Sequence, residues 1–288
     1  DLRGNSGGSL YEANKLVGLF ISPGATLQVK ESDGSIRSMG DARARHLWKK
    51  PLAVMVDRYS ASASEIFAGA IQDYQRGIII GQQTFGKGTV QKLDDLSSGQ
   101  IKITESKFYR ITGSGMQNKG IHPDIVLPST WDIEEVGESS YESALPWDEI
   151  KPIRYRKFSM DPSLISTLRD EHLLRVKKNP NLQYILSIRK RYEEQKNKDV
   201  VSLNIENRKL EKEERQIWAL DIENKRRSSL DLEIFTSFQA MEDYNELKKE
   251  EDEIIKINLD DDYILNEGTQ ILTDFTIFNQ SIYLTKAS

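Results

Sequence analysis

The sequence predicts an α/β fold for the first part of the chain and a mainly helical second part. Continuous apolar runs at residues 52–56 and 77–80 are typical of strands buried on both faces. The segment between them, residues 62–74, carries the apolar stripe of a helix. A strand, a helix and a second strand in this order indicate an α/β domain with a largely parallel central region. Beyond Lys151 the pattern changes to highly charged helical segments.

Four elements precede this unit. The chain begins with a loop at residues 1–8, whose glycines permit positive φ and a close approach to another group. A helical pattern follows at residues 10–20 and ends at the Ser-Pro-Gly of residues 22–24. Residues 26–30 and 35–38 flank Ser-Asp-Gly, which predicts a hairpin.

Extended segments follow the second buried strand. Residues 89–96 and 101–111 alternate in character, and residues 120–127 close the domain. We therefore expect the strand–helix–strand unit to be joined by further strands.

The composition shifts after this domain. Seven acidic residues lie between Asp132 and Glu149, and the sequence has no Lys or Arg between Lys119 and Lys151. Such a shift is typical of a linker or of a strap across the surface. We therefore predict an α/β domain at 1–128, an acidic linker at 129–150 and a helical extension at 151–288.

Helix signals recur in the last segment. Asp161 followed by Pro162 predicts an N-cap with proline at the first helical position. Pro180 precedes a second helical pattern, and residues 264–275 suit one more helix near the end of the chain.

Apolar residues between these helices allow two patterns. Val201, Leu203 and Ile205 alternate, which suggests a short extended piece. Leu203, Leu210 and Ile217 share a seven-residue spacing. The repeat is too short for a coiled coil, so we favour a solvated amphipathic helix that packs on one side.

Composition excludes several classes of site. The net charge of −5 comes without a basic stripe, which argues against nucleic acid as a partner. Because the sequence has no cysteine, disulfides, zinc–thiolate sites and cysteine nucleophiles are excluded. Its three histidines lack ligand spacing, and no apolar run reaches the roughly 18–20 residues of a membrane span.

A serine-rich turn stands where the first buried strand becomes a helix. Ser60, Ser62 and Ser64 alternate with alanine there. A strand-to-helix turn exposes a nucleophile, and the unpaired N–H groups and positive dipole of the helix start stabilise an oxyanion. Ser62-x-x-Glu65 is also a capping box. On the local pattern alone, helix capping is the favoured interpretation of Ser62.

A lysine between glycines follows the second buried strand. Lys87 lies between Gly86 and Gly88, so a tight backbone bend can bring it beside another group. A lysine acts as a general base only when it is neutral, which requires desolvation or a similar influence. The alternatives are a solvated turn lysine or an anion-binding loop. The P-loop spacing from Gly81 to Lys87 is present, but Gly88 replaces the Ser or Thr that binds magnesium.

The motifs together are more specific than each alone. They are DLRGNSGG at 1–8, SASASEIFAGAIQDY at 60–74, GQQTFGKGTVQ at 81–91 and GIHPDI at 120–125. This set resembles the carboxyl-terminal processing protease family, which are serine–lysine peptidases with a crotonase- and Clp-protease-like fold. The bacterial tail-specific proteases, which carry a helical C-terminal extension, are the most similar subgroup. The resemblance implies that residues 1–128 are the C-terminal portion of a serine peptidase core.

The resemblance also implies roles for six residues. Ser62 matches the nucleophile, Lys87 the general base and Gln91 the residue that orients the lysine. The backbone N–H groups of Ala63 and of the glycine turn, Gly8 rather than Gly7, match the oxyanion hole. Ser60 or Ser64 would then cap the helix, and no cofactor or metal is implied.

Further expectations concern the whole protein. In this family a PDZ domain precedes the first motif, so we expect the chain to be a fragment. The resemblance implies unfolded or C-terminally tagged protein substrates and an adaptor on the helical extension. It also implies a periplasmic location with proximity to a membrane.

Two other functions stay open. A non-catalytic binding module of the same fold would not need the intact Ser62–Lys87–Gln91 set. A crotonase-type acyl-CoA enzyme would need a CoA pocket and gives no reason for pairing Ser62 with Lys87.

Overall fold

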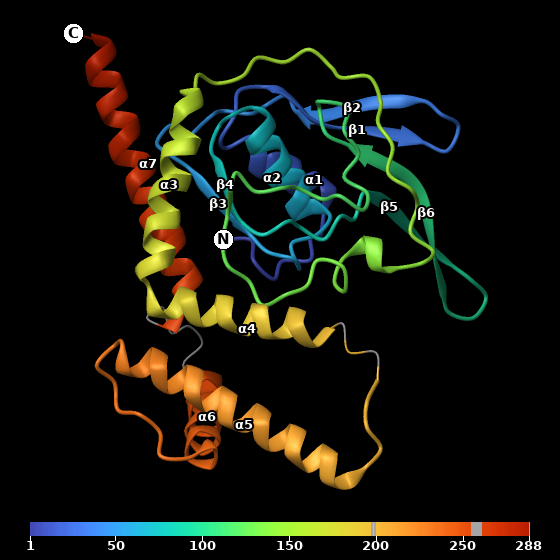
Figure 1. Ribbon diagram of the computed structural model, residues 1–288. Coiled ribbons are helices and arrows are strands. Elements are labelled where there is room, and N and C mark those ends of the chain that lie inside the picture. The colour runs from blue at the N-terminus through green and yellow to red at the C-terminus, as the bar shows by residue number, and fades with distance from the viewer. Residues whose placement is uncertain (197, 199, 255–260, 288) are drawn as a thin grey trace. The chain divides into compact units, whose positions relative to one another are not determined.

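The computed structural model describes residues 1–196, 198, 200–254 and 261–287 (Figure 1). The chain forms two compact units, and each is described by itself. The first comprises Asp1–Leu127, Trp131–Arg169 and Gln270–Ser288. The second comprises Pro128–Thr130 and Asp170–Thr269.

The described elements confirm the predicted fold class, an α/β core followed by helices. Up to Leu127 they are α1 (Leu10–Val17), β1 (Gly24–Glu31), β2 (Ile36–Asp41), β3 (Ala53–Val56), α2 (Ala63–Asp73), β4 (Ile78–Gly81), β5 (Thr89–Asp95), β6 (Gln100–Tyr109) and β7 (Ile125–Val126). After it come the 3-10 helix η1 (Glu138–Ser140) and the helices α3 (Pro162–Lys178), α4 (Pro180–Lys196), α5 (Ile205–Ser228), α6 (Phe238–Ile254) and α7 (Tyr263–Ala287).

The predicted strand–helix–strand unit is present. β3 and β4 pair in parallel, with Val54 opposite Ile79, and β7 pairs in parallel on the other side of β4. The crossover helix α2 has ten of its eleven residues buried, so it is a core helix and not an amphipathic surface helix.

The other strands form a separate antiparallel sheet in the order β2-β1-β6-β5. The predicted hairpin is β1–β2, and the two extended segments pair as β5–β6, a long ribbon in Figure 1. The expectation of a largely parallel central region therefore holds only for the small sheet of β3, β4 and β7, and it is wrong for the larger sheet.

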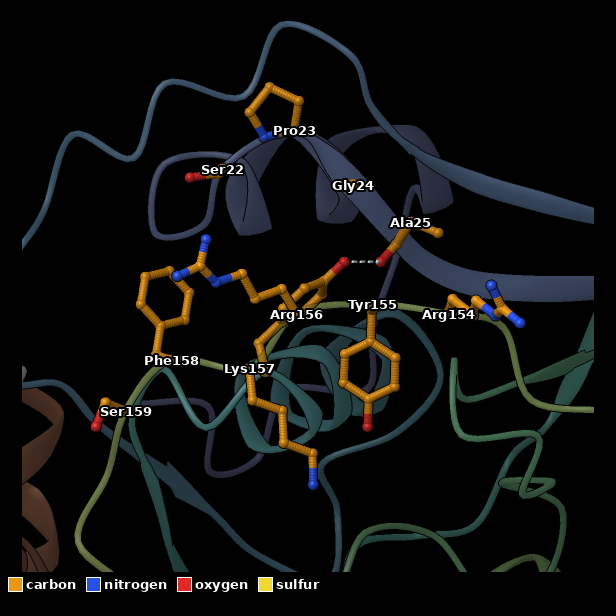
Figure 2. Close-up of a pocket in the computed structure, with 11 residues that line it drawn as sticks. Ser22, Pro23, Gly24, Ala25, Arg154, Tyr155, Arg156, Lys157, Phe158 and Ser159 are labelled. Atoms are coloured by element: carbon orange, nitrogen blue, oxygen red, sulfur yellow. Dashed lines mark hydrogen bonds between the residues drawn. The ribbon is translucent and has the colours of Figure 1, made fainter.

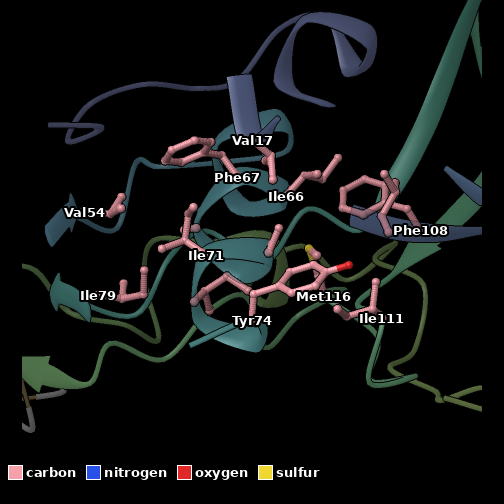
Figure 3. Packing of buried hydrophobic residues seen from close by; sticks show 14 of the residues in the cluster. Val17, Val54, Ile66, Phe67, Ile71, Tyr74, Ile79, Phe108, Ile111 and Met116 are labelled. Atoms are coloured by element: carbon pink, nitrogen blue, oxygen red, sulfur yellow. The ribbon is translucent and has the colours of Figure 1, made fainter. Parts of the chain in front are cut away.

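The core of the first unit gathers around α2 (Figure 3). Ile66, Phe67 and Ile71 on the helix pack with Val17 from α1 and Phe108 from β6. Burying a side chain of this kind stabilises the fold by roughly 1.5–3 kcal/mol. The start of α2 is therefore held on a rigid support.

Residues 131–150, here called the strap, belong to the first unit and contact its α/β core. Arg58, 1% exposed, donates to the carbonyl oxygen of Ile133 at 2.8 Å and also to that of Val136. A Cβ at Gly137, which lies at φ +134°, would collide with the Arg58 guanidinium. The predicted linker boundaries stay a prediction, and these contacts show where the strap is anchored.

The helical segments agree with the sequence at the caps. α3 begins at Pro162, with the Asp161 carboxylate accepting the N–H of Ser163 at 3.0 Å. The extended piece expected at residues 201–205 is wrong where it includes Ile205, because the Asn204 side chain caps α5 and the helix begins there. Within the described residues, no helix has the length and apolarity needed to cross a membrane.

The seven-residue spacing does not mark the packed face of α5. Leu210 and Ile217 are 59% and 62% exposed. This part of the expectation for one-sided packing is therefore wrong, because the spaced residues lie on the solvated side.

Candidate active site

The turn into α2 holds Ser62 in an unusual conformation. Ser62 is the N-cap residue of α2, at φ +56° and ψ −113°. Few non-glycine residues occupy this region of φ and ψ, and strain of this kind is concentrated at functional sites. A serine on a sharp, strained strand-to-helix turn projects its hydroxyl outward, as a nucleophile requires.

The N-terminal glycine loop packs directly on this turn. Gly7 lies at φ +98°, and a Cβ there would be 2.6 Å from the carbonyl oxygen of Ala61 and 2.9 Å from the Ser62 Cβ. The loop is also joined to β3, since Leu2 N donates to Met55 O at 2.8 Å. Only glycine allows this approach.

The two serines beside Ser62 hold the same loop. Ser60 Oγ donates to the carbonyl oxygen of Leu2 at 2.7 Å, and Ser64 Oγ donates to that of Asn5 at 3.0 Å. The expectation that Ser60 or Ser64 caps α2 is therefore wrong, because Ser62 occupies the N-cap position. The flanking serines instead fix the loop around Ser62.

Backbone N–H groups beside Ser62 remain available to a ligand. The N–H of Gly7 donates to Asn5 Oδ1 at 2.9 Å. Within the part of the chain that the structure describes, the N–H groups of Gly8 and Ala63 have no acceptor. The N–H groups that stay open beside Ser62 are therefore those of Gly8 and Ala63, and not that of Gly7.

Glu65 joins the serine turn to the lysine turn. Its Oε2 accepts the N–H of Ser62 at 2.7 Å and the N–H of Lys87 at 2.9 Å. Its Oε1 accepts the N–H of Gly86 at 2.7 Å and the Thr84 hydroxyl at 2.6 Å. One buried carboxylate therefore sets the separation of the two turns.

Sequence reasoning gave Glu65 only the role of a capping box and missed its bond to the lysine turn. The glycines around Lys87 were the available signal, because a tight turn leaves N–H groups that need an acceptor. Burial raises the pKa of Glu65 to about 7, and the four donated hydrogen bonds act in the opposite direction.

The six predicted groups meet in one place. A pocket of about 580 Å³ is lined by all of them: Ser62, Lys87, Gln91, Gly7, Gly8 and Ala63. Among the described residues, the side chains of Lys87 and Gln91 make no hydrogen bond, so the arrangement is open. Catalytic hydrogen bonds are often longer before substrate binds.

A β-bulge precedes Gln91. The register between β5 and β6 shifts between Val90 and Gln91. A bulge re-aims the side chains that follow it and is frequent beside active sites. This irregularity accompanies the entry of Gln91 into the pocket.

A second pocket, of about 490 Å³, contains none of these groups (Figure 2). Arg154, Arg156 and Lys157 line it, and the Tyr74 hydroxyl donates to Ala25 O at 2.8 Å at its edge. It offers no carboxylate or histidine for acid–base chemistry.

Within the described residues, no group of three or more His, Asp or Glu side chains is placed to hold a metal ion.

Comparisons with known proteins identify relatives of both parts of the chain. Residues 1–127 match the family model of peptidase family S41, and residues 131–276 match that of the C-terminal domain of tail specific protease. The tail-specific protease of Haemophilus influenzae is 37% identical over 308 residues, covering 100% of this chain and 41% of that protein. The carboxy-terminal-processing protease of Bartonella bacilliformis is 40% identical over 129 residues, covering 44% of this chain and 30% of that protein.

Among solved structures, the photosystem II D1 C-terminal processing protease is 35% identical with a TM-score of 0.40, covering 44% of this chain and 33% of that one. The chain spans about two fifths of the length of the Haemophilus relative. The second family match extends over more than half of the 288 residues, and the first contains every predicted site residue. The chain therefore belongs to the tail-specific proteases of peptidase family S41.

Proposed function

We propose that this protein is a serine-type endopeptidase in which Ser62 is the nucleophile and Lys87 the general base. One observation carries the proposal. The six predicted groups come from three separate segments of the chain and line a single pocket. The strained turn at Ser62 supports the same role, because it presents the hydroxyl at the start of a helix.

The reaction begins with proton transfer. The Lys87 amine takes the proton of Ser62 Oγ while Oγ attacks the scissile carbonyl carbon. The carbonyl oxygen becomes an oxyanion, which the N–H groups of Gly8 and Ala63 stabilise. Lys87 then donates its proton to the leaving amine as the C–N bond breaks. Water, deprotonated by Lys87, hydrolyses the ester on Ser62 and restores the free hydroxyl.

Two residues position this pair. In this proposal the side-chain oxygen of Gln91 accepts from the Lys87 amine and orients it when substrate is bound. Glu65 is a positioning residue, because its carboxylate accepts the backbone N–H groups of Ser62 and Lys87. A shift of about 1 Å in either turn would cost roughly 100-fold in rate.

The substrates that we propose are unfolded or C-terminally tagged proteins, in keeping with the relatives' names. We also propose a periplasmic location, proximity to a membrane and an adaptor bound to the helical extension. These proposals concern the whole protein, because this chain covers only 41% of the Haemophilus relative and 30% of the Bartonella relative.

The test is hydrolysis of an unfolded protein with an apolar C-terminus, using the full-length protein. Ser62→Ala should lose activity by about 10³-fold or more, since little besides binding and the oxyanion hole would remain. The matched control is Ser97→Ala, at an exposed position between β5 and β6, which should keep full activity. Equal rates for Ser62→Ala and wild type would instead favour the non-catalytic binding module.

A further inference from the structure

A neighbouring pocket of about 450 Å³ shares Lys87 and Gln91 with the reaction pocket. Its other walls include Tyr59 and Ala61 before the Ser62 turn, Phe85 before Lys87, and Tyr141 on the strap. A polypeptide that places its scissile bond at Ser62 therefore passes the mouth of this neighbouring pocket. Neighbouring residues of an extended chain are only about 3.3 Å apart along its axis, so the next side chain is within reach.

Nine residues line this pocket. Three of them are aromatic, and four others carry polar side chains: Ser6, Lys87, Gln91 and Glu138. The rings of Phe85 and Tyr141 have centroids 6.4 Å apart, and Tyr59 stacks edge-on against Trp131 at 5.1 Å. Aromatic faces bury large apolar areas and give ring contacts of their own. A site of this size that combines ring faces with a small number of polar groups is typical of side-chain or small-ligand recognition.

Hydrogen bonds hold the strap against the other walls of this pocket. Glu138 N donates to Phe85 O at 2.9 Å, and the Glu138 carboxylate accepts from Gln117 Nε2 at 3.0 Å. Arg58, buried beneath, donates to strap carbonyl groups and to Thr84 O in the lysine turn. The strap and the lysine turn are thus tied to the same cation. A preformed wall costs little ordering entropy when a ligand binds.

We infer that this pocket binds an apolar side chain, aromatic or branched aliphatic, of the substrate residue next to the scissile bond, and that Tyr141 is a specificity-determining residue. The assignment rests on the proposed function, since it needs peptide hydrolysis at Ser62. It deepens that function by giving the strap, which the sequence marks only by its acidity, a direct contact with substrate.

The chemistry of the walls decides the class of side chain. An apolar side chain gains about 25 cal/mol for each Å² of apolar surface that it buries. A charged side chain would lose hydration against Tyr59, Phe85 and Tyr141. The two charged groups of the lining already have other roles, since Lys87 is the proposed base and the Glu138 carboxylate accepts from Gln117. We therefore expect Phe and Leu to be preferred over Ala, and Ala over Asp.

The experiment measures kcat/KM for matched peptides that carry Phe, Leu, Ala or Asp on each side of one cleavable bond, in the full-length protein. Tyr141 is 58% exposed, so Tyr141→Ala should fold. It should lower kcat/KM for the Phe and Leu peptides by about 10-fold, mainly through KM, and that of the Ala peptide by less than about 2-fold. Tyr141→Phe should keep the wild-type preference, because the ring and not the hydroxyl forms the wall.

Tyr11→Ala is the matched control, since Tyr11 is 61% exposed and belongs to α1. It should leave the ratio of Phe to Ala peptide cleavage unchanged. If wild type cleaves the peptides but Tyr141→Ala retains the wild-type Phe-to-Ala ratio, the subsite is overturned and the proposed function stands. If wild type and Ser62→Ala show the same rates with every peptide, the proposed function fails and the subsite fails with it.

Discussion

Two buried glutamates, one in each unit, hold different kinds of structure together. Glu65 is 0% exposed and accepts three backbone N–H groups and one hydroxyl. Glu267 is 4% exposed, and its Oε1 lies 2.8 Å from His172 Nδ1 and accepts from Arg175 Nε at 2.9 Å. The first carboxylate fixes the backbone of two turns, whereas the second joins side chains of α3 and α7.

This difference separates a part of the site from a part of the scaffold. The backbone N–H groups around Glu65 cannot rotate away from it. Each of the two Glu65 side-chain oxygens therefore has to act as a hydrogen-bond acceptor. Side-chain donors such as those of His172 and Arg175 can adjust when their partner changes. We therefore expect substitutions at Glu65 to affect activity and stability together, and substitutions at Glu267 to affect mainly stability.

The largest expected effect is that of Glu65→Gln. In either orientation the amide NH₂ would face two donors, so hydrogen bonds to the Ser62 or the Gly86 side of the network are lost. We predict a fall in kcat of about 100-fold or more and a loss of about 2–3 kcal/mol in the free energy of unfolding. Peptide hydrolysis and urea unfolding measure the two. Wild-type kcat in a folded Glu65→Gln protein would show that Glu65 does not position the turns.

Gly7→Ala comes next, because the Ser62 turn is fixed by the glycine loop as well as by Glu65. The new methyl group would meet Ala61 O and Ser62 Cβ at a positive φ, which costs more than about 2 kcal/mol and displaces the turn. Gly99→Ala is the control, since Gly99 lies at φ +87° with nothing within 4 Å of its Cβ. It should cost only about 1 kcal/mol and leave kcat unchanged. Equal thermal unfolding and kcat for the two variants would contradict close packing at Gly7.

Glu267→Gln provides the contrasting case in the second unit. The amide oxygen can still accept from Arg175, so we predict a loss of about 1–2 kcal/mol in unfolding free energy and peptidase activity within about 2-fold of wild type. Circular dichroism and the same peptide assay check this. A loss of kcat as large as that of Glu65→Gln would erase the distinction between the two glutamates.

The smallest effect is a pH dependence of stability. The pKa of Glu65 is raised from 4.5 to about 7, so the folded protein binds this proton more tightly than the unfolded chain. Its contribution to the free energy of unfolding is therefore complete below about pH 4.5 and is lost as pH rises through 7. The difference between wild type and Glu65→Gln should shrink over this interval in urea titrations. A difference that grows with pH would mean that the pKa is lowered instead.

The sequence predicted those parts of the molecule that contiguous patterns encode. The apolar runs of β3 and β4 and the turn residues around Ser62 and Lys87 are local signals, and the structure bears out the strand–helix–strand unit. The register of β1 against β6 was out of reach, because pairing between segments that far apart leaves no local pattern.

The same limit applies to the candidate site. The second role of Glu65 depends on the fold, which brings Lys87 N beside a carboxylate 22 residues earlier in the chain. The positive φ of Ser62 depends on how the glycine loop packs, and the contact of the strap with Phe85 depends on buried Arg58. Each is a consequence of tertiary packing and not of residue type.

The decisive measurement is kcat of Lys87→Ala in the full-length protein, because Lys87 is the proposed base for the Ser62 nucleophile. Lys92→Ala is the control, a β5 lysine 2.9 Å from Asp94 and outside both pockets. We expect a 10²- to 10⁴-fold fall in kcat for Lys87→Ala, wild-type kcat for Lys92→Ala, and no change in thermal unfolding for either variant. Full peptidase activity in Lys87→Ala would contradict this role of Lys87.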